Sequence, residues 1–385
     1  MNHLGRSPFP LIPEGWYHAC HTAELSRGPV GVAVGPAKFV AFQGLRGRAA
    51  VLDARCSHMG ADLSRGCVRE GRLHCPLHDW RYDGDGQCVG IPASEKIPSF
   101  ARQATFPTAE IGGHVLFSNT LRAPFPVPFY DGVSPEALLP AAPFEFVVDT
   151  PWYMIGANAF DLQHFRVAHD RTLRSTPLLE SPSPLARRIT ATYDVSGTSW
   201  RDRLTRRFSG DQVVMSVTVW GGVNILVTAT FRRTTSYGMV FVRPLEGGRT
   251  HLRNIVWIPR RRGVVARAVL DPLDAWVRRH FIRAFVMDDA TRSDGVRYNP
   301  ATLIEADEEM SRYFEWLARI SSGEVTKGEP HAQHDFVGGS GGVLPRHEFG
   351  SIGGADDSSV AGDTGNGSDD RRPDAGNQPA APGTD

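Results

Sequence analysis

Hydrophobic positions in the first third of the chain occur in short runs that are separated by glycine, proline or charged residues. Runs of this length, bounded by turn-forming residues, are typical of strands in a small all-β unit. Within residues 15–120 we therefore expect strands at 30–34, 39–42, 49–52 and 114–118. The next segment is rich in proline and predicts a linker between two domains. Its prolines are Pro124, Pro126, Pro128, Pro140 and Pro143.

The second block has longer apolar runs, which predict the strands of a larger sheet. These runs are 188–193, 212–219, 224–231, 239–244 and 251–258. The pairs Gly221-Gly222 and Gly247-Gly248 supply turns between runs, so neighbouring strands should pair antiparallel. Apolar residues at three- and four-residue spacing predict helices over 264–289 and 306–320. Strands followed by helices of this kind indicate an α+β fold.

From residue 323 onward the sequence consists mainly of Gly, Asp, Ser and Pro with almost no apolar residues. Such a segment cannot bury enough surface to fold, and we expect it to be disordered. The remaining residues are numerous enough for two domains with full cores.

The charge balance and hydropathy exclude several classes of protein. Lys+Arg and Asp+Glu both number 42, which gives no indication of a nucleic-acid partner. No apolar stretch approaches the length of a membrane span, and the proline-containing start does not resemble a signal peptide. We therefore expect a cytoplasmic protein in which Cys20, Cys67 and Cys88 are buried thiols.

Two short clusters carry the strongest chemical signal, Cys56-Ser-His58 and Cys75-Pro-Leu-His78. Each cluster offers one thiolate and one imidazole. Together they match the ligand set of a [2Fe–2S] centre in which two histidines replace two cysteines on one iron. A zinc site is the competing use of these four residues, but zinc modules favour Cys-x(2–4)-Cys and His-x(3–5)-His spacings.

A second constellation comprises Asn158, Asp161, His164 and His169. The first three recur every three residues and should share one face of a helix. His169 lies five residues beyond His164, about 140° away on a regular helix, so a π-bulge would be needed to realign the pair. Two imidazoles and one carboxylate form the facial triad of mononuclear non-haem iron(II). The alternative is a helix with two incidental polar histidines.

The clusters and their flanks resemble Rieske domains, and the segment 158–169 is similar to the Asn-x2-Asp-x2-His-x4-His signature of Rieske non-haem iron oxygenase catalytic subunits, in the vanillate O-demethylase branch. The resemblance covers about residues 10–320. It implies an all-β Rieske domain over 10–122 and a catalytic domain of the helix-grip type, with an antiparallel sheet, over 123–322. The disordered tail would then be 323–385.

The resemblance also implies roles for individual residues. Cys56, His58, Cys75 and His78 would bind the cluster, and His164 and His169 would bind the iron. A late aspartate completes the triad in this family. The alignment places Asp289 there, with Asp288 as the alternative because Arg292 and Ser293 replace the usual apolar pair.

Asp161 has a different implied role, in which it links His164 to His78 of a neighbouring subunit in a homotrimer. Asn158 belongs to the same motif.

The activity implied is that of a mono- or dioxygenase that passes electrons from the cluster to Fe(II), with O2 as co-substrate and a small organic substrate. Hydroxylation or oxidative demethylation is expected, and desaturation or oxidative cyclisation uses the same machinery. No Gly-x-Gly-x-x-Gly follows a strand, so NAD(P)H would act only through a separate reductase, with or without a ferredoxin. An electron carrier of Rieske type and a helix-grip ligand-binding protein are the alternatives from other classes.

Overall fold

The computed structural model describes residues 7–324 of the chain. All but the first two positions of the predicted disordered tail lie outside these residues.

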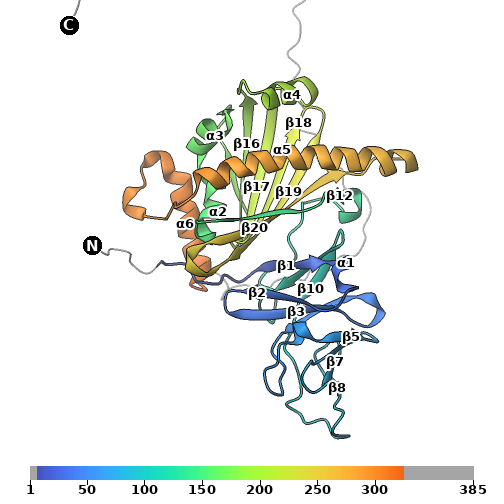
Figure 1. The fold of residues 1–385 in the computed structure, drawn as a ribbon. Helices are drawn as coiled ribbons and strands as arrows, with labels where there is room; N and C mark the ends of the chain where they lie inside the picture. The colour runs from blue at the N-terminus through green and yellow to red at the C-terminus, as the bar shows by residue number, and fades with distance from the viewer. Residues whose placement is uncertain (1–6, 325–385) are drawn as a thin grey trace, which may run out of the picture. The chain divides into compact units, whose positions relative to one another are not determined.

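Three small antiparallel sheets make up the N-terminal part (Figure 1). The first contains β1 (Trp16–His21), β11 (His114–Ser118) and β10 (Thr108–Ile111) in that order. The second contains β2 (Val30–Val34), β3 (Ala37–Gln43), β4 (Ala49–Asp53) and β9 (Thr105–Phe106). The third contains β5 (Cys67–Arg69), β6 (Arg72–His74), β7 (Arg81–Tyr82) and β8 (Cys88–Gly90). All four strands predicted in this part are confirmed.

A nine-stranded antiparallel sheet forms the second part, and its central order is β12-β20-β19-β18-β17-β16-β14. Its long strands are β16 (Ala186–Val195), β17 (Gln212–Trp220), β18 (Asn224–Phe231), β19 (Thr235–Pro244) and β20 (Thr250–Pro259). Its shorter strands are β12 (Leu138–Pro140), β13 (Phe144–Val148), β14 (Arg171–Leu173) and β15 (Leu178–Ser183). The five long strands confirm the five predicted runs and their antiparallel pairing.

The helices are α1 (Thr22–Leu25), α2 (Trp152–Ala157), α3 (Leu162–His169), α4 (Trp200–Phe208), α5 (Asp271–Arg292) and α6 (Glu308–Ser321). A π-helical turn, Ala266–Leu270, precedes α5. The long helix α5 crosses the large sheet (Figure 1), while aromatic residues of α2 and α6 pack against the same sheet in one buried cluster. Both predicted helices are confirmed, with α5 extending three residues further than expected. Among the described residues, no helix is long and apolar enough to cross a membrane.

The predicted linker is only partly irregular. Pro140 is the last residue of β12, which pairs with β20, and Pro143 immediately precedes β13. Proline lacks the N–H that a central strand needs, but an edge strand tolerates it. The proline-rich composition therefore concealed two short strands that the sequence analysis missed, and α4 was missed as well.

Candidate metal centres and their pocket

The two Cys/His loops are built alike. In the first loop, Cys56 N donates to Ala61 O at 2.9 Å and Gly60 N donates to Cys56 O at 2.8 Å. The second repeats this pattern, since Cys75 N donates to Trp80 O at 2.9 Å and Asp79 N donates to Cys75 O at 3.1 Å. Each loop therefore closes on its cysteine by the same pair of backbone hydrogen bonds.

This closure requires a left-handed residue at the fourth position after each cysteine. Gly60 has φ +73° and Asp79 has φ +53°, a region in which glycine is at ease and aspartate is tolerated. Asp79 is held there by His74 Nδ1 at 2.7 Å and by Arg81 at 3.0 Å. Hydrogen bonds from His74 and then Arg81 lower the pKa of Asp79.

The cysteines and histidines of the loops differ in exposure. Cys56 and Cys75 are buried in one cluster with Tyr82, whereas His58 and His78 are exposed. The two imidazole rings lie 4.7 Å apart between centroids, and His58 stacks on a tryptophan, Trp80, at 4.4 Å. Two thiolates on the inside and two adjacent imidazoles on the outside suit the unequal irons of a [2Fe–2S] centre.

The sulfur atoms already have donors around them. Tyr82 Oη lies 3.1 Å from Cys56 Sγ. Burial raises the pKa of Cys75, and the backbone N–H groups of Leu77 and His78 oppose this by hydrogen bonding to the sulfur. Such donors stabilise a sulfur that carries negative charge, as thiolates bound to a cluster do.

These four residues do not gather around one point. Among the described residues, only one group brings three potential metal-binding atoms of His, Cys, Asp or Glu side chains within 4.8 Å of one another. That group does not include Cys56, His58, Cys75 or His78. One zinc ion needs four donors at about 2.0–2.3 Å from a common centre. The two cysteines and two histidines, whose potential ligand atoms do not converge on one point, therefore fit a centre with two irons better than a single zinc ion.

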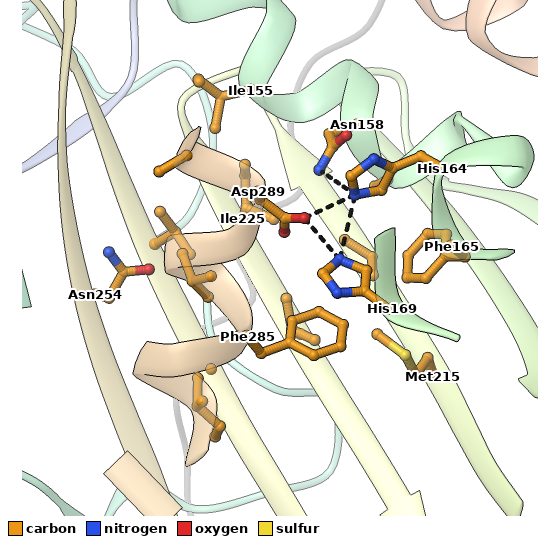
Figure 2. Close-up of a pocket in the computed structure, with 18 of the residues that line it drawn as sticks. Ile155, Asn158, His164, Phe165, His169, Met215, Ile225, Asn254, Phe285 and Asp289 are labelled. Atoms are coloured by element: carbon orange, nitrogen blue, oxygen red, sulfur yellow. Dashed lines mark hydrogen bonds and ion pairs between the residues drawn. The ribbon is translucent and has the colours of Figure 1, made fainter. Parts of the chain in front are cut away.

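That single group is His164, His169 and Asp289. Asp289 Oδ1 lies 2.7 Å from His164 Nε2 and 2.6 Å from His169 Nε2, and the two nitrogens are 3.2 Å apart (Figure 2). Bonds of about 2.1 Å at right angles place neighbouring ligand atoms about 3 Å apart. The three atoms are thus spaced as one face of a six-coordinate metal ion requires.

The backbone around the histidines differs from the prediction. Asn158 lies in a separate 3₁₀ turn, Asn158–Phe160, and Asp161 (φ −87°, ψ 92°) interrupts the helix and begins α3. Asn158, Asp161 and His164 therefore do not share the face of one continuous helix. No π-bulge separates His164 from His169 either, because α3 is α-helical to its last residue, His169. The two Nε2 atoms nevertheless lie 3.2 Å apart, and the planes of the two imidazole rings make an angle of 81°.

The side chains of the motif have distinct contacts. Asp161 Oδ1 accepts a hydrogen bond from His164 N at 3.0 Å and so caps α3. Asn158 Nδ2 lies 3.4 Å from His164 Nε2. Phe285 of α5 stacks on the buried His169 ring, with centroids 3.5 Å apart and planes at 11° (Figure 2).

The two histidines stabilise the negatively charged form of the Asp289 carboxylate. Burial alone would raise the pKa of Asp289, but hydrogen bonds from His164 and His169 outweigh this effect and hold the pKa below its usual value. Asp288 is exposed and does not belong to the group. Between the two candidates, only Asp289 contacts both histidines.

A cavity of about 940 Å³ adjoins this group. It lies between α5 and the large sheet and is walled mostly by aliphatic and aromatic side chains. Representative members are Met154, Met215, Val227, Val240, Leu252 and Phe285. Alternating positions of β17–β20 supply much of this wall, which the strand pattern could have indicated. The sequence analysis named none of these residues, nor Asn254 in the same wall.

Comparison with known protein families supports the interpretation of the two Cys/His loops as part of a Rieske domain. The family model of the Rieske [2Fe–2S] domain matches residues 15–101. This part of the chain is a Rieske domain. The match lies inside the predicted range of 10–122, and the boundaries themselves remain a prediction.

Two curated relatives are similar to about a quarter of the chain. Cholesterol 7-desaturase of Ciona intestinalis is 44% identical over 105 residues, which are 26% of this chain and 22% of that protein. The oxygenase component of 3-ketosteroid-9-alpha-monooxygenase from Mycolicibacterium smegmatis is 39% identical over 104 residues, 27% of each chain. The chain thus spans about a quarter of the length of these relatives.

The fold extends the similarity beyond the Rieske domain. The crystal structure of dicamba monooxygenase bound to dicamba superimposes with a TM-score of 0.62 and covers 83% of this chain and all of that chain, at 18% identity. Both parts of the molecule therefore have the fold seen in that crystal structure. The α+β prediction, with an antiparallel sheet after the Rieske domain, is confirmed.

Proposed function

We propose that this chain is the catalytic component of a Rieske non-haem iron oxygenase, which oxidises a small organic substrate with O2. The observation that carries the proposal is the convergence of His164, His169 and Asp289 beside an apolar cavity, in a chain that also contains a Rieske domain. When bound, the cluster and the iron would supply single electrons and O2 activation. Three protein ligands on one face leave the remaining positions open for small molecules.

The chain's own residues would hold and shield this centre. Phe285 fixes the ring plane of His169 by stacking, and the Asp161 cap fixes the start of the helix that carries both histidines. The apolar wall would exclude water and orient an apolar substrate by shape. The cluster would be held by Cys56, His58, Cys75 and His78, as the loops suggest.

The proposal extends to a homotrimer in which Asp161 links His164 to His78 of a neighbouring copy. The exposure of His78 supports such a contact, and a metal-bound imidazole commonly donates its other N–H to a carboxylate. Asp161 has a second carboxylate oxygen besides the one that caps α3, so both roles are compatible.

Electrons would come from a separate reductase, with or without a ferredoxin. The relative from Mycolicibacterium smegmatis is named as an oxygenase component, which supports a multi-protein system, and NAD(P)H would then act through the reductase. Exposed Met59 and Leu77 at the tips of the cluster loops offer apolar contacts for such a donor.

Hydroxylation or oxidative demethylation is the proposed outcome, by a mono- or dioxygenase. Desaturation is the second candidate, favoured by the name of the Ciona intestinalis relative. The same residues would serve either outcome.

A single-turnover experiment tests the proposal. Protein with a chemically reduced cluster is mixed with O2 and candidate apolar compounds, and reoxidation of the cluster is followed by its visible absorption. We expect compounds that fill the cavity to accelerate reoxidation in the wild type and to have no effect in Asp289→Ala. Equal acceleration in both proteins, or none in either, would instead favour a Rieske electron carrier or a ligand-binding protein.

A further inference from the structure

Helix α4 presents a stripe of apolar side chains to solvent. Trp200, Leu204 and Phe208 recur every four residues, so they lie on one face of the helix. All three are exposed, Trp200 to 56% and Phe208 to 64%. The fold therefore leaves an apolar face of α4 uncovered. Exposed arginines occupy neighbouring positions of the same helix, namely Arg201, Arg203 and Arg207.

The beginning of α5 and the π-helical turn before it carry a second stripe. Its members are separated by three or four residues along the helix, which places them on one face. They are all exposed and comprise Val265, Val269, Leu273, Trp276 and Val277. In Figure 1 this end of α5 extends past the strands of the large sheet. Apolar residues of a surface helix normally face the core, as the aromatic residues of α6 do.

The charge beside the second stripe is positive. Between residues 259 and 287 the acids are Asp271 and Asp274, and both form ion pairs with Arg261. They therefore leave the other arginines of this segment uncompensated. The exposed arginines that have no ion pair within the described part of the chain are Arg260, Arg262, Arg267 and Arg283.

The two stripes adjoin each other and the cavity. Trp200 meets Phe281 of α5 edge to face, with ring centroids 5.9 Å apart. Leu204 and Phe208 of the first stripe and Val277 of the second line the cavity and are also exposed. The apolar wall of the cavity therefore continues onto the surface between α4 and α5.

An exposed apolar surface of this extent marks an interaction site. A second copy of the chain bound face to face would bring the unpaired arginines of two copies together, which is unfavourable. An anionic phospholipid surface fits both features. Its acyl region accepts valine, leucine and phenylalanine, its interfacial region suits tryptophan, and its phosphates attract arginine. A fluid lipid surface also leaves the cavity accessible between α4 and α5, whereas a docked protein would cover it.

We propose that the α4–α5 face, defined by these two stripes and their arginines, docks onto a membrane surface that contains anionic phospholipids. The two helices lie in the interface and do not span the bilayer. Docking places the outer part of the cavity wall against the acyl region, from which an apolar molecule enters without crossing water. The docking is independent of the proposed function, whereas delivery of a substrate from the bilayer rests on it.

Vesicle flotation of the full-length holoprotein measures docking. The vesicles consist of phosphatidylcholine alone, or of phosphatidylcholine and phosphatidylglycerol in equal parts. We expect the wild type to bind the anionic vesicles about tenfold more strongly than the neutral ones. High salt should reduce this preference, because it screens the attraction between arginine and phosphate. The salt dependence tests the proposal without any substitution.

Two kinds of variant separate the apolar contribution from the charge. The double variant Leu273→Ser, Trp276→Ser removes apolar side chains from the second stripe and should bind anionic vesicles about tenfold more weakly. The double variant Arg262→Glu, Arg267→Glu should lose the preference for anionic vesicles. Neither pair lines the cavity. Trp200→Ser, a single change in the first stripe, should weaken binding by a smaller factor.

The matched control makes the same kinds of change elsewhere. Leu121→Ser, Arg122→Glu alters two exposed residues outside the α4–α5 face and should bind as the wild type does. The cluster absorption and circular dichroism of each variant show that it has folded. The proposal is overturned if the wild type floats with neither kind of vesicle or equally with both, or if the variants of the face bind as the control does.

The other occupants of this face give different results. Sedimentation velocity without lipid measures the oligomeric state of the same proteins. A wild type that binds no vesicles, with an oligomer that Leu273→Ser, Trp276→Ser breaks and the control keeps, would overturn the proposal and assign the face to a second copy of the chain. Docking is measured without turnover, so vesicle binding in a protein whose cluster reoxidation does not respond to any compound would support docking and contradict the oxygenase function.

Discussion

His164 Nε2 and Asp289 Oδ1 lie 2.7 Å apart although 125 positions separate the two residues in the chain. The fold brings them together by laying α5 across the sheet beside α3, so the site exists only when the second part of the molecule has folded. His169 Nε2 completes the group at 2.6 Å from the same oxygen.

Replacing Asp289 by alanine should release the mononuclear iron and leave the cluster intact. The substitution removes one of three converging ligand atoms, whereas the cluster ligands belong to separate loops. Iron analysis should fall from about three to about two atoms per chain, with the visible spectrum of the cluster unchanged. Asp288→Ala is the matched control, since Asp288 is exposed, and it should retain all the iron. The opposite pattern would assign the ligand role to Asp288.

Asp161 can be tested by two substitutions that separate its capping role from its proposed link. Asp161→Ala loses the hydrogen bond to His164 N and should destabilise the protein by about 1 kcal/mol, measured by denaturant unfolding. Asp161→Asn keeps a capping oxygen and should unfold nearly as the wild type does. Both should turn over far more slowly if the carboxylate also links two subunits. If Asp161→Asn turns over at the wild-type rate, Asp161 only caps α3 and does not link two subunits.

Tyr82→Phe should lower the reduction potential of the cluster. The tyrosine hydroxyl lies 3.1 Å from Cys56 Sγ, and donors to sulfur favour the reduced, more negative cluster. A hydrogen bond of about 1 kcal/mol corresponds to about 40 mV for a one-electron couple, which spectroelectrochemical titration resolves. Ser57→Ala, which removes a hydroxyl bonded to Tyr82 Oη, should shift the potential less. An unchanged potential in Tyr82→Phe would show that the hydroxyl does not donate to the sulfur.

A buried histidine pair in the Rieske part should make stability depend on pH. His18 Nε2 and His114 Nδ1 lie 3.0 Å apart. Burial, followed by nearby positive charge, lowers the pKa of His18 to about 2, and burial lowers the pKa of His114 to about 4. Both are therefore neutral in the folded protein near neutral pH.

Because these folded-state pKa values lie below the unfolded value of about 6.5, the unfolded chain binds more protons as the pH falls. The stabilisation is complete above pH 6.5 and declines below it, by about 1.4 kcal/mol per pH unit for each histidine. Urea unfolding at a series of pH values from 7.5 to 4.5 measures this slope. His114→Gln should reduce the slope by about one proton, and an unchanged slope would contradict the assignment.

The sequence predicted the parts of the site whose residues lie close together in the chain. The Cys-x-His and Cys-x-x-His spacings indicated a Rieske domain, which the family match confirms, because both candidate ligands of each loop come from one turn. The strand runs of the large sheet were also correctly predicted, since each contains its own apolar pattern. Asp289 could be placed only by resemblance, because the contact with His164 spans two-fifths of the fold's length and no local pattern marks it.

The local backbone geometry around His164 was predicted incorrectly for a related reason. Asn-x2-Asp-x2-His favours one continuous helical face, but the Asp161 side chain captures the His164 N–H and starts a new helix. A side chain that competes for backbone donors has this effect at any helix start.

The most direct test of the account is metal and sulfide analysis of the anaerobically purified full-length protein. The account predicts a red-brown protein with about three irons and about two acid-labile sulfides per chain, from which a chelator removes one iron before the cluster is lost. A colourless protein that contains zinc in place of iron would contradict it.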